Sequence, residues 1–382
     1  MIDPLEFIDS LNSLDIQFVT GVPDSLLKNV CACIASHFPP TRHVIATNEG
    51  AAVGLAIGHY LATGRPALVY MQNSGMGNII NPVTSLADQQ VYAIPMLFMI
   101  GWRGEILSTG HQIHDEPQHV KQGQITLRQL DILNIPYRII DNNTESIIYV
   151  LKELTELAIF RSCPVALIVR KQTFAPFLMA ESDHENNLLT RAAAIAGVIS
   201  ALPSDVPIVS TTGMASRELF ELRKASSSGH HRDFLTVGGM GHAGQIAAGI
   251  AIARPDRKIV CIDGDGAVLM HMGSLAISAD CANLLHVVIN NGAHDSVGGQ
   301  PTKGAVLDIS QIAKACGYTH IAHAVTADEI MRNIKDMLSR RGSSFLEIKC
   351  RKGTSADLGR PDRTPLQNKV DFMRFLQENS HE

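Results

Sequence analysis

The sequence lacks several features that mark whole classes of protein. Lys and Arg (32) are outnumbered by Asp and Glu (37), and the formal net charge of −5 provides no basic field for nucleic acid. No apolar run reaches the length of a transmembrane helix, and the opening MIDPLEFIDSLNSLD has acids where a signal peptide needs positive charge. We therefore expect a cytoplasmic protein that binds a small molecule and has neither a nucleic-acid nor a membrane partner.

Cysteine is sparse and its spacing is uninformative. The seven cysteines are scattered and form no CxxC pair, which disfavours both a zinc site and a disulfide framework. No GxGxxG motif follows an early strand, so a nucleotide-binding oxidoreductase is a weak alternative. The 382 residues are 45% hydrophobic and 18% charged, a composition typical of a globular protein with room for two domains.

Short apolar runs alternate with segments of helical periodicity in both halves of the chain. The runs are IQFVTG, HVIATN, ALVYMQ, PMLFMIG, YRII and VALIVR in the first half, and PIVSTTG, FLTVGG, KIVCIDG, LHVVINN and FLEIKC in the second. This alternation indicates parallel strands joined by crossover helices. The segment between the halves is irregular and contains a proline, as linkers do. The sequence thus predicts an α/β protein with two doubly wound parallel-sheet domains, residues 1–170 and 191–382, joined by a linker at 171–190.

Two apolar runs of the second half end in polar residues that suit a metal ion. KIVCIDG leads to Asp265, and LHVVINN ends at Asn291 after one crossover helix. Ligands of parallel sheets bind where the strands end, and neighbouring strand ends lie about 5 Å apart. A carboxylate and an amide oxygen at this spacing suit Mg²⁺, which commonly also binds phosphate. GDG alone is an ordinary turn signal, and its combination with NNG is more specific.

These residues match a known family. GDGA followed by INNG resembles the diphosphate-binding motif of thiamine diphosphate enzymes, in which Asp265, Asn291 and the backbone oxygen of Ala293 would hold Mg²⁺. VGGMGHAGQIAAGIA is similar to the segment upstream of that motif, and places Met240 where an apolar residue wedges between the two rings of the cofactor. A core methionine is the alternative for Met240. The resemblance implies cofactor contacts at Glu49, Gly238, Gly239, Met240, Gly264, Asp265, Gly266, Ala267, Asn291, Ala293 and His294.

Glu49 is the candidate acid of the first domain. It follows the apolar run HVIATN, with Asn48 as a predicted N-cap, and begins a helix of small and apolar residues. A glutamate in the first turn of a helix is more often a partner of the helix dipole. The segment resembles the pyrimidine-binding domain of thiamine diphosphate enzymes, and this implies that Glu49 engages the pyrimidine ring of the cofactor.

The compact arrangement of the chain resembles the phosphonopyruvate decarboxylase family. The matching motifs are GVPDSLLKN, QNSGMGNIINPVTSL, GWRG, DEPQHVKQG, SRELFEL and NNGAHDSVGGQPT. The resemblance implies decarboxylation of 3-phosphonopyruvate to phosphonoacetaldehyde and CO₂, with thiamine diphosphate and Mg²⁺ as cofactors, in phosphonate biosynthesis. Sulfopyruvate decarboxylase, a close relative, and a catalytically silent homologue are the alternatives. Met214 stands where many relatives have lysine, which leaves the substrate less secure than the reaction class.

Further site residues follow from the chemistry of a 2-oxo acid decarboxylase. Proton transfer needs acid and base groups, and Asp24 and His114 are the candidates, with His111 and His119 nearby. The segment ILSTGHQIHDEPQH is longer than its counterpart in the family, so the role of its histidines stays open. A phosphonate needs local donors and cations, for which the candidates are Ser25, Arg103, Lys121, Arg217 and His294.

The family resemblance also predicts how the chains assemble. In thiamine diphosphate enzymes the cofactor bridges the first domain of one chain and the second domain of its partner. We therefore expect a homodimer or a dimer of dimers with interchain active sites.

Overall fold

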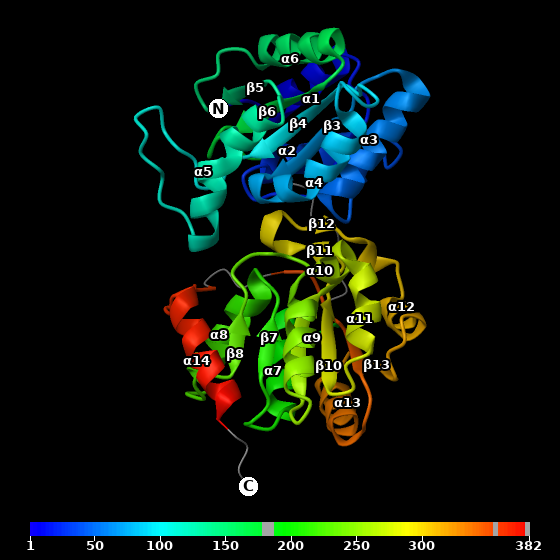
Figure 1. The fold of residues 1–382 in the computed structure, drawn as a ribbon, viewed down its shortest axis with the longest axis vertical. Helices are drawn as coiled ribbons and strands as arrows, with labels where there is room; N and C mark the ends of the chain where they lie inside the picture. The colour runs from blue at the N-terminus through cyan, green and yellow to red at the C-terminus, as the bar shows by residue number, and fades with distance from the viewer. Residues whose placement is uncertain (178–186, 354–357, 379–382) are drawn as a thin grey trace. The chain divides into compact units, whose positions relative to one another are not determined.

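The chain forms two compact units, Met1–Glu181 and Ser182–Glu382, in a computed structural model that describes residues 1–177, 187–353 and 358–378. Each unit contains one six-stranded parallel sheet with helices on both faces (Figure 1). The predicted α/β class with two doubly wound sheets is confirmed. Residues 178–186 of the predicted linker lie outside the described residues. Phe174, at the start of that linker, is buried in the core of the first unit and bridges to Ile2.

The first unit has the strand order β2-β1-β3-β4-β6-β5. Its strands are β1 (Val19–Gly21), β2 (His43–Ile45), β3 (Leu68–Gln72), β4 (Met96–Gly101), β5 (Tyr137–Ile140) and β6 (Pro164–Val169). Its helices are α1 (Pro4–Ser13), α2 (Lys28–His37), α3 (Glu49–Thr63), α4 (Met76–Pro82), α5 (Pro117–Ile132) and α6 (Ile147–Arg161), with short turns at Asn73–Gly75 and Val83–Ala87.

Alternating residues of the central strands divide the core of the first unit into two layers. On β3, Leu68 and Tyr70 pack with helices α1, α2 and α6, whereas Val69 and Met71 pack with helices α3 and α4. Successive side chains of a strand point to opposite faces, so a strand covered on both sides must be apolar at every position. This explains why the sequence shows continuous apolar runs here.

The second unit has the strand order β13-β14-β10-β9-β7-β8. Its strands are β7 (Ile208–Ser210), β8 (Asp233–Leu235), β9 (Ile259–Gly264), β10 (Leu284–Asn290), β13 (His320–Ala324) and β14 (Ser344–Lys349), and a small hairpin pairs β11 (Ala293–His294) with β12 (Gln300–Pro301). Its helices are α7 (Arg191–Ala201), α8 (Met214–Ala225), α9 (Ala243–Ala253), α10 (Asp265–Met270), α11 (Leu275–Ala279), α12 (Ile309–Ala315), α13 (Ala327–Ser339) and α14 (Pro365–Gln377). Short turns lie at Met272–Ser274, Asp295–Val297 and Lys303–Ala305.

Strand β13 was not among the apolar runs that we expected to be strands. It lies at the edge of its sheet, and four of its five residues, starting with His320, are partly or fully exposed. An edge strand buries less of its surface than a central strand, so its sequence shows no continuous apolar run. Among the described residues, no helix combines the length and apolar character needed to cross a membrane.

Candidate active site

Polar residues of the first unit gather at the carboxyl edge of its sheet. Strands β1, β3 and β4 are neighbours, and they lead into Asp24, Asn73 and Arg103 respectively. Asn73 is buried and donates to the carbonyl of Arg103 over 2.9 Å, which joins two of these strand ends. The topology thus brings together groups that are far apart in sequence, as expected for a ligand site of a parallel sheet.

Glu49 begins helix α3 at the same edge and is 5% exposed. The predicted N-cap is confirmed, because the Asn48 side chain accepts the N–H of Ala51 over 2.8 Å. Asn78 donates to Oε2 of Glu49 over 2.6 Å, and a Cβ at Gly75 would lie 2.3 Å from Oε1. The carboxylate is therefore held closely between Asn78 and Gly75, and a side chain at position 75 would displace it. Such a buried carboxyl group fits the pyrimidine nitrogen of a thiamine cofactor.

Asp24 is completely buried. Its Oδ2 accepts the N–H of Leu26 over 3.0 Å, and its Oδ1 has no hydrogen-bond partner among the described residues. Burial raises the pKa of Asp24 to about 6, against the backbone hydrogen bonds and the positive charge of Arg103, which lower it. A Cβ at Gly101 would lie 2.1 Å from Oδ2, so the end of strand β4 fits closely around this carboxyl group. An acid tuned in this way can exchange a proton near neutral pH.

Arg103 forms a bidentate ion pair with Asp115 instead of standing as a free cation. Its Nε donates to Oδ2 over 2.8 Å and its Nη2 to Oδ1 over 2.5 Å, while Nη1 donates to Ser25 Oγ over 3.0 Å. Burial acts to raise the pKa of Asp115, but the hydrogen bonds and charge of Arg103 lower it well below its ordinary value. Asp115 was absent from our expected site, although it lies in the motif DEPQHVKQG.

The other predicted residues in and before helix α5 differ in their exposure to solvent. His119 is buried on helix α5, whereas Lys121 of the same helix and both His111 and His114 of the preceding loop are exposed. That loop is closed by a bridge between Ile106 and Gln112. The structure therefore holds Asp24, Ser25 and Arg103 together and leaves His114 and Lys121 on the surface of the unit.

In the second unit, Asp265 and Asn291 follow neighbouring strands. Strand β9 pairs with β10 in a register that sets Gly264 opposite Ile289, so both residues lie at the same edge. Asp265 is 2% exposed and accepts a short hydrogen bond from the hydroxyl of Thr302. Burial raises its pKa to about 6, against this hydrogen bond, which lowers it.

Both backbone and side chains fit closely around Asp265 and Asn291. A Cβ at Gly304 would lie 2.4 Å from Oδ2 of Asp265. Asn291 donates from Nδ2 to Asp295 over 2.6 Å, and its Oδ1 accepts the N–H of Ala293 over 3.2 Å. A buried carboxylate and an amide oxygen at the same edge of the sheet fit the donor set that Mg²⁺ prefers.

Met240 and His294 both lie close to Gly266. A Cβ at Gly266 would lie 3.1 Å from Cε1 of His294 and 3.4 Å from Cε of Met240. Met240 is half-buried in a turn with Gly238 and Gly239, and the positive φ of Gly239 (66°) favours glycine there. Burial lowers the pKa of His294 to about 4, so this ring is neutral at pH 7 and offers hydrogen bonds without charge.

The remaining predicted residues of the second unit lie around this edge. Gly264 ends strand β9, and Ala267 is buried in helix α10. Arg217 of helix α8 donates from Nε to the carbonyl of Gly359 over 2.8 Å and from Nη2 to the carbonyl of Leu358. Its partners are thus neutral carbonyl groups, in contrast to those of Arg103.

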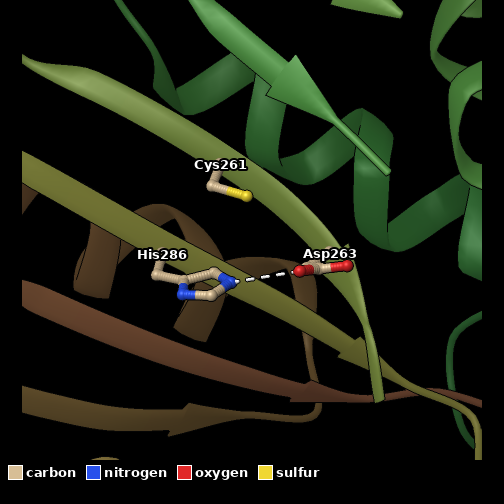
Figure 2. A group of neighbouring side chains, drawn as sticks. All are labelled: Cys261, Asp263 and His286. Carbon is tan, nitrogen blue, oxygen red and sulfur yellow. Dashed lines mark ion pairs between the residues drawn. The ribbon is translucent and has the colours of Figure 1, made fainter. Parts of the chain in front are cut away.

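A second polar cluster lies inside the same sheet, formed by Cys261, Asp263 and His286 (Figure 2). His286 Nε2 lies 3.5 Å from Asp263 Oδ2, and Nδ1 lies 3.0 Å from the hydroxyl of Tyr318. Structural zinc sites have four ligands and catalytic sites keep an open position for water. Three ligands are too few for a structural site and, although three is the usual number in a catalytic site, these residues are at most 2% exposed and leave no open position for water. We therefore interpret the cluster as a polar link in the core. The side chain of Asp263 accepts the N–H of Gly264 over 2.9 Å and so stabilises the backbone directly before Asp265.

Comparisons with known proteins match both units. The model described as "Thiamine pyrophosphate enzyme, N-terminal TPP binding domain" matches residues 6–125, and the corresponding C-terminal domain model matches residues 211–348. The chain is 33% identical over 393 residues to "Phosphonopyruvate decarboxylase" of Streptomyces viridochromogenes, covering 98% of this chain and 95% of that protein.

Two further relatives carry the same or a related name. The protein of the same name from Streptomyces hygroscopicus is 31% identical, with 99% and 95% of the two chains covered. "Sulfopyruvate decarboxylase" of Methanosarcina acetivorans is 25% identical, with 91% of each chain covered. The chain belongs to the phosphonopyruvate decarboxylase family of thiamine pyrophosphate (thiamine diphosphate) enzymes, and both of its units have the predicted cofactor-binding fold.

Proposed function

We propose that this chain is a thiamine diphosphate-dependent carboxy-lyase that converts 3-phosphonopyruvate to phosphonoacetaldehyde and CO₂. The observation that carries the proposal is the 33% identity to a phosphonopyruvate decarboxylase across 98% of the chain. Both units contain a buried carboxyl group, Glu49 and Asp265, and these are the two acids that we assign to the cofactor. These residues support an active enzyme over a silent homologue.

The residues of the second unit fit the diphosphate end of the cofactor. We assign Mg²⁺ to Asp265, to Oδ1 of Asn291 and to the backbone oxygen of Ala293, with Gly264, Gly266 and Ala267 next to the diphosphate. Met240 and His294, which both lie close to Gly266, would contact the rings. When bound, thiamine diphosphate supplies a nucleophilic carbon and accepts the electrons released as CO₂ leaves.

The acids of the first unit supply proton transfer. Glu49, held by Asn78, would bind the pyrimidine ring nitrogen and share a proton with it. Asp24, whose pKa is raised to about 6 by burial, would hold the proton that replaces CO₂ on the product carbon. His114 remains a proposal from sequence, since it lies exposed in the loop before helix α5.

The phosphonate needs positive charge, and its proposed partners differ in what they offer. Among the described residues Arg217 donates to carbonyl oxygens and to no carboxylate, whereas the charge of Arg103 is balanced by Asp115. Ser25 and the neutral His294 can add hydrogen bonds, and Lys121 is an exposed cation. The proposed anion site therefore depends most on Arg217.

We also propose that the chain works as a homodimer or a dimer of dimers, with each site built from two chains. Helix α3, which begins with Glu49, exposes Leu55 and Leu61 beside Gly54 and Gly58, whose surroundings are open. An exposed apolar face with small residues suits close contact with a second copy.

A substrate panel tests the function. Purified protein with Mg²⁺ and thiamine diphosphate should decarboxylate phosphonopyruvate with a kcat/KM several orders of magnitude above that for pyruvate, because unpaired cations in a closed site are costly. Sulfopyruvate, which carries one negative charge fewer on its anionic group, should come second. If sulfopyruvate is preferred, the chain is a sulfopyruvate decarboxylase, and if pyruvate reacts equally well, the phosphonate assignment is wrong.

A further inference from the structure

A buried cluster of three charged side chains, Arg191, Glu218 and Asp295, is hydrogen-bonded to the side chain of Asn291. Arg191, the first residue of helix α7, donates to Glu218 through Nε and Nη2 over 2.8 and 3.0 Å and to Asp295 through Nη1 over 2.8 Å. The side chains of Arg191 and Asp295 are each 8% exposed, and that of Glu218 is 4% exposed. None of these three residues belonged to the site expected from the sequence.

Asp295 connects this cluster to Asn291. Its Oδ2 accepts from Asn291 Nδ2 over 2.6 Å and from the N–H of Gly353 over 3.1 Å. A carboxylate can only accept, so it must face the NH₂ end of the amide. The amide oxygen is thereby turned away from Asp295, and one lone pair remains on it after the contact with Ala293 N–H.

We infer that Arg191 and Asp295 are positioning residues that fix the amide of Asn291 with its oxygen toward the magnesium ion. The inference rests on the proposed magnesium site. Residues that hydrogen-bond to a metal ligand set the orientation of that ligand and strengthen metal binding. Arg191 keeps Asp295 in place, because without it two buried carboxylates, Asp295 and Glu218, would lose the cation that they share.

The charge of the cluster acts in the same direction. One arginine and two acids leave a formal charge of −1 next to Asn291, in addition to the charge of Asp265. This charge lies in a buried region, where screening by water and salt is weak, and it favours a divalent cation.

A double-mutant cycle tests the inference with Mn²⁺ as the probe. Mn²⁺ binding is measured by electron paramagnetic resonance on the full chain with thiamine diphosphate and no substrate, for Asn291→Ala, Asp295→Ala and the double variant. Each single substitution should raise the Kd of Mn²⁺ about 10- to 100-fold, and the double variant should bind no more weakly than Asn291→Ala. The inference would be wrong if the Kd changes of the two single variants multiplied in the double variant. It would also be wrong if Asp295→Ala left the Kd of Mn²⁺ unchanged.

A matched ion pair provides the control. Arg223 and Asp233 form an equally buried bidentate pair in the same unit, with no contact to Asn291. Arg191→Met should weaken Mn²⁺ binding and Arg223→Met should not, although both leave a buried acid unpaired. If Arg191→Met does not fold, Asp295→Asn takes its place, because the asparagine keeps one oxygen and loses the negative charge. This variant should also weaken Mn²⁺ binding. An unchanged Kd in Asn291→Ala would instead disprove the magnesium site itself, and the inference with it.

Discussion

Asn78 donates from Nδ2 to Oε2 of Glu49 over 2.6 Å, so a side chain of helix α4 holds the carboxylate that begins helix α3. Gly75 closes the other side, since a Cβ there would lie 2.3 Å from Oε1. The position of this acid is therefore set by three segments of chain, two of which contribute no charge.

The first prediction uses this close fit. Gly75→Ala should displace the Glu49 carboxylate and lower kcat about 100-fold or more, because small misplacements of a catalytic group are costly. Glu49→Gln should lower kcat by a similar or larger factor. Gly249→Ala in helix α9, where a Cβ would meet no atom within 4 Å, is the control and should keep full activity. Full activity in Gly75→Ala would contradict the proposed role of Glu49.

The second prediction concerns the metal ligand. Asp265→Ala should abolish activity at ordinary Mg²⁺ concentrations, because it removes the charged protein ligand of the proposed site. Thr302→Val, which removes the hydroxyl that donates to Asp265, should weaken Mg²⁺ binding about 10- to 100-fold. An activity assay measures the first effect, and calorimetric titration with Mg²⁺ and thiamine diphosphate measures binding in both variants, with the exposed Asp256→Ala as the control. Cofactor affinity equal to that of the wild type in Asp265→Ala would remove the metal assignment.

The third prediction concerns Asp24 and the pH dependence of stability. Its pKa is about 6 in the folded chain and 3.8 ordinarily, so the folded state binds more protons between about pH 4 and pH 6. The contribution of Asp24 to stability is therefore present below pH 4 and is lost as the pH rises through 6, by about 3 kcal/mol in total. Asp24→Asn should remove this dependence while reducing activity.

Urea unfolding of the first unit between pH 4 and 7.5 measures this effect. Trp102, the single tryptophan of the chain, is buried in that unit and reports its unfolding by fluorescence. Asp24→Asn should be more stable than the wild type at pH 7 and equal to it near pH 4. Parallel stability curves for the two proteins across this range would show that burial does not shift the pKa of Asp24.

The fourth prediction tests the proposed interchain site. Glu49→Gln and Asp265→Ala are each expected to be inactive, and mixing them with subunit exchange should restore about a quarter of the sites, because half of the dimers are mixed and one of their two sites is intact. Exchange is followed by native mass spectrometry with one variant isotopically labelled. Exchange without any recovery of activity would mean that each site is built within one chain.

The sequence alone determined the class of the fold and the ends of the main strands. Continuous apolar runs predict strands buried on both faces, and such runs became β3, β4, β9 and β10. Strand ends in a parallel sheet converge at one edge, which is why Asp265 and Asn291 could be placed together before the structure was known. The N-cap of Asn48 was equally local, because capping depends on neighbouring residues alone.

The tertiary structure decided which charges are free and which are already paired. Arg103, Lys121, Arg217 and His294 appear in the sequence as four cations for one anion. The structure pairs Arg103 with Asp115, binds Arg217 to carbonyl groups, leaves Lys121 exposed and makes His294 neutral through burial. Some partners of the site residues, such as Asn78 for Glu49 and Thr302 for Asp265, come from other connections of the sheet, and apolar periodicity carries no information about them. Arg191 illustrates this best: it reaches Asn291 only through Asp295, and a contact relayed through a third side chain depends on burial and distance, which exist only in the folded chain.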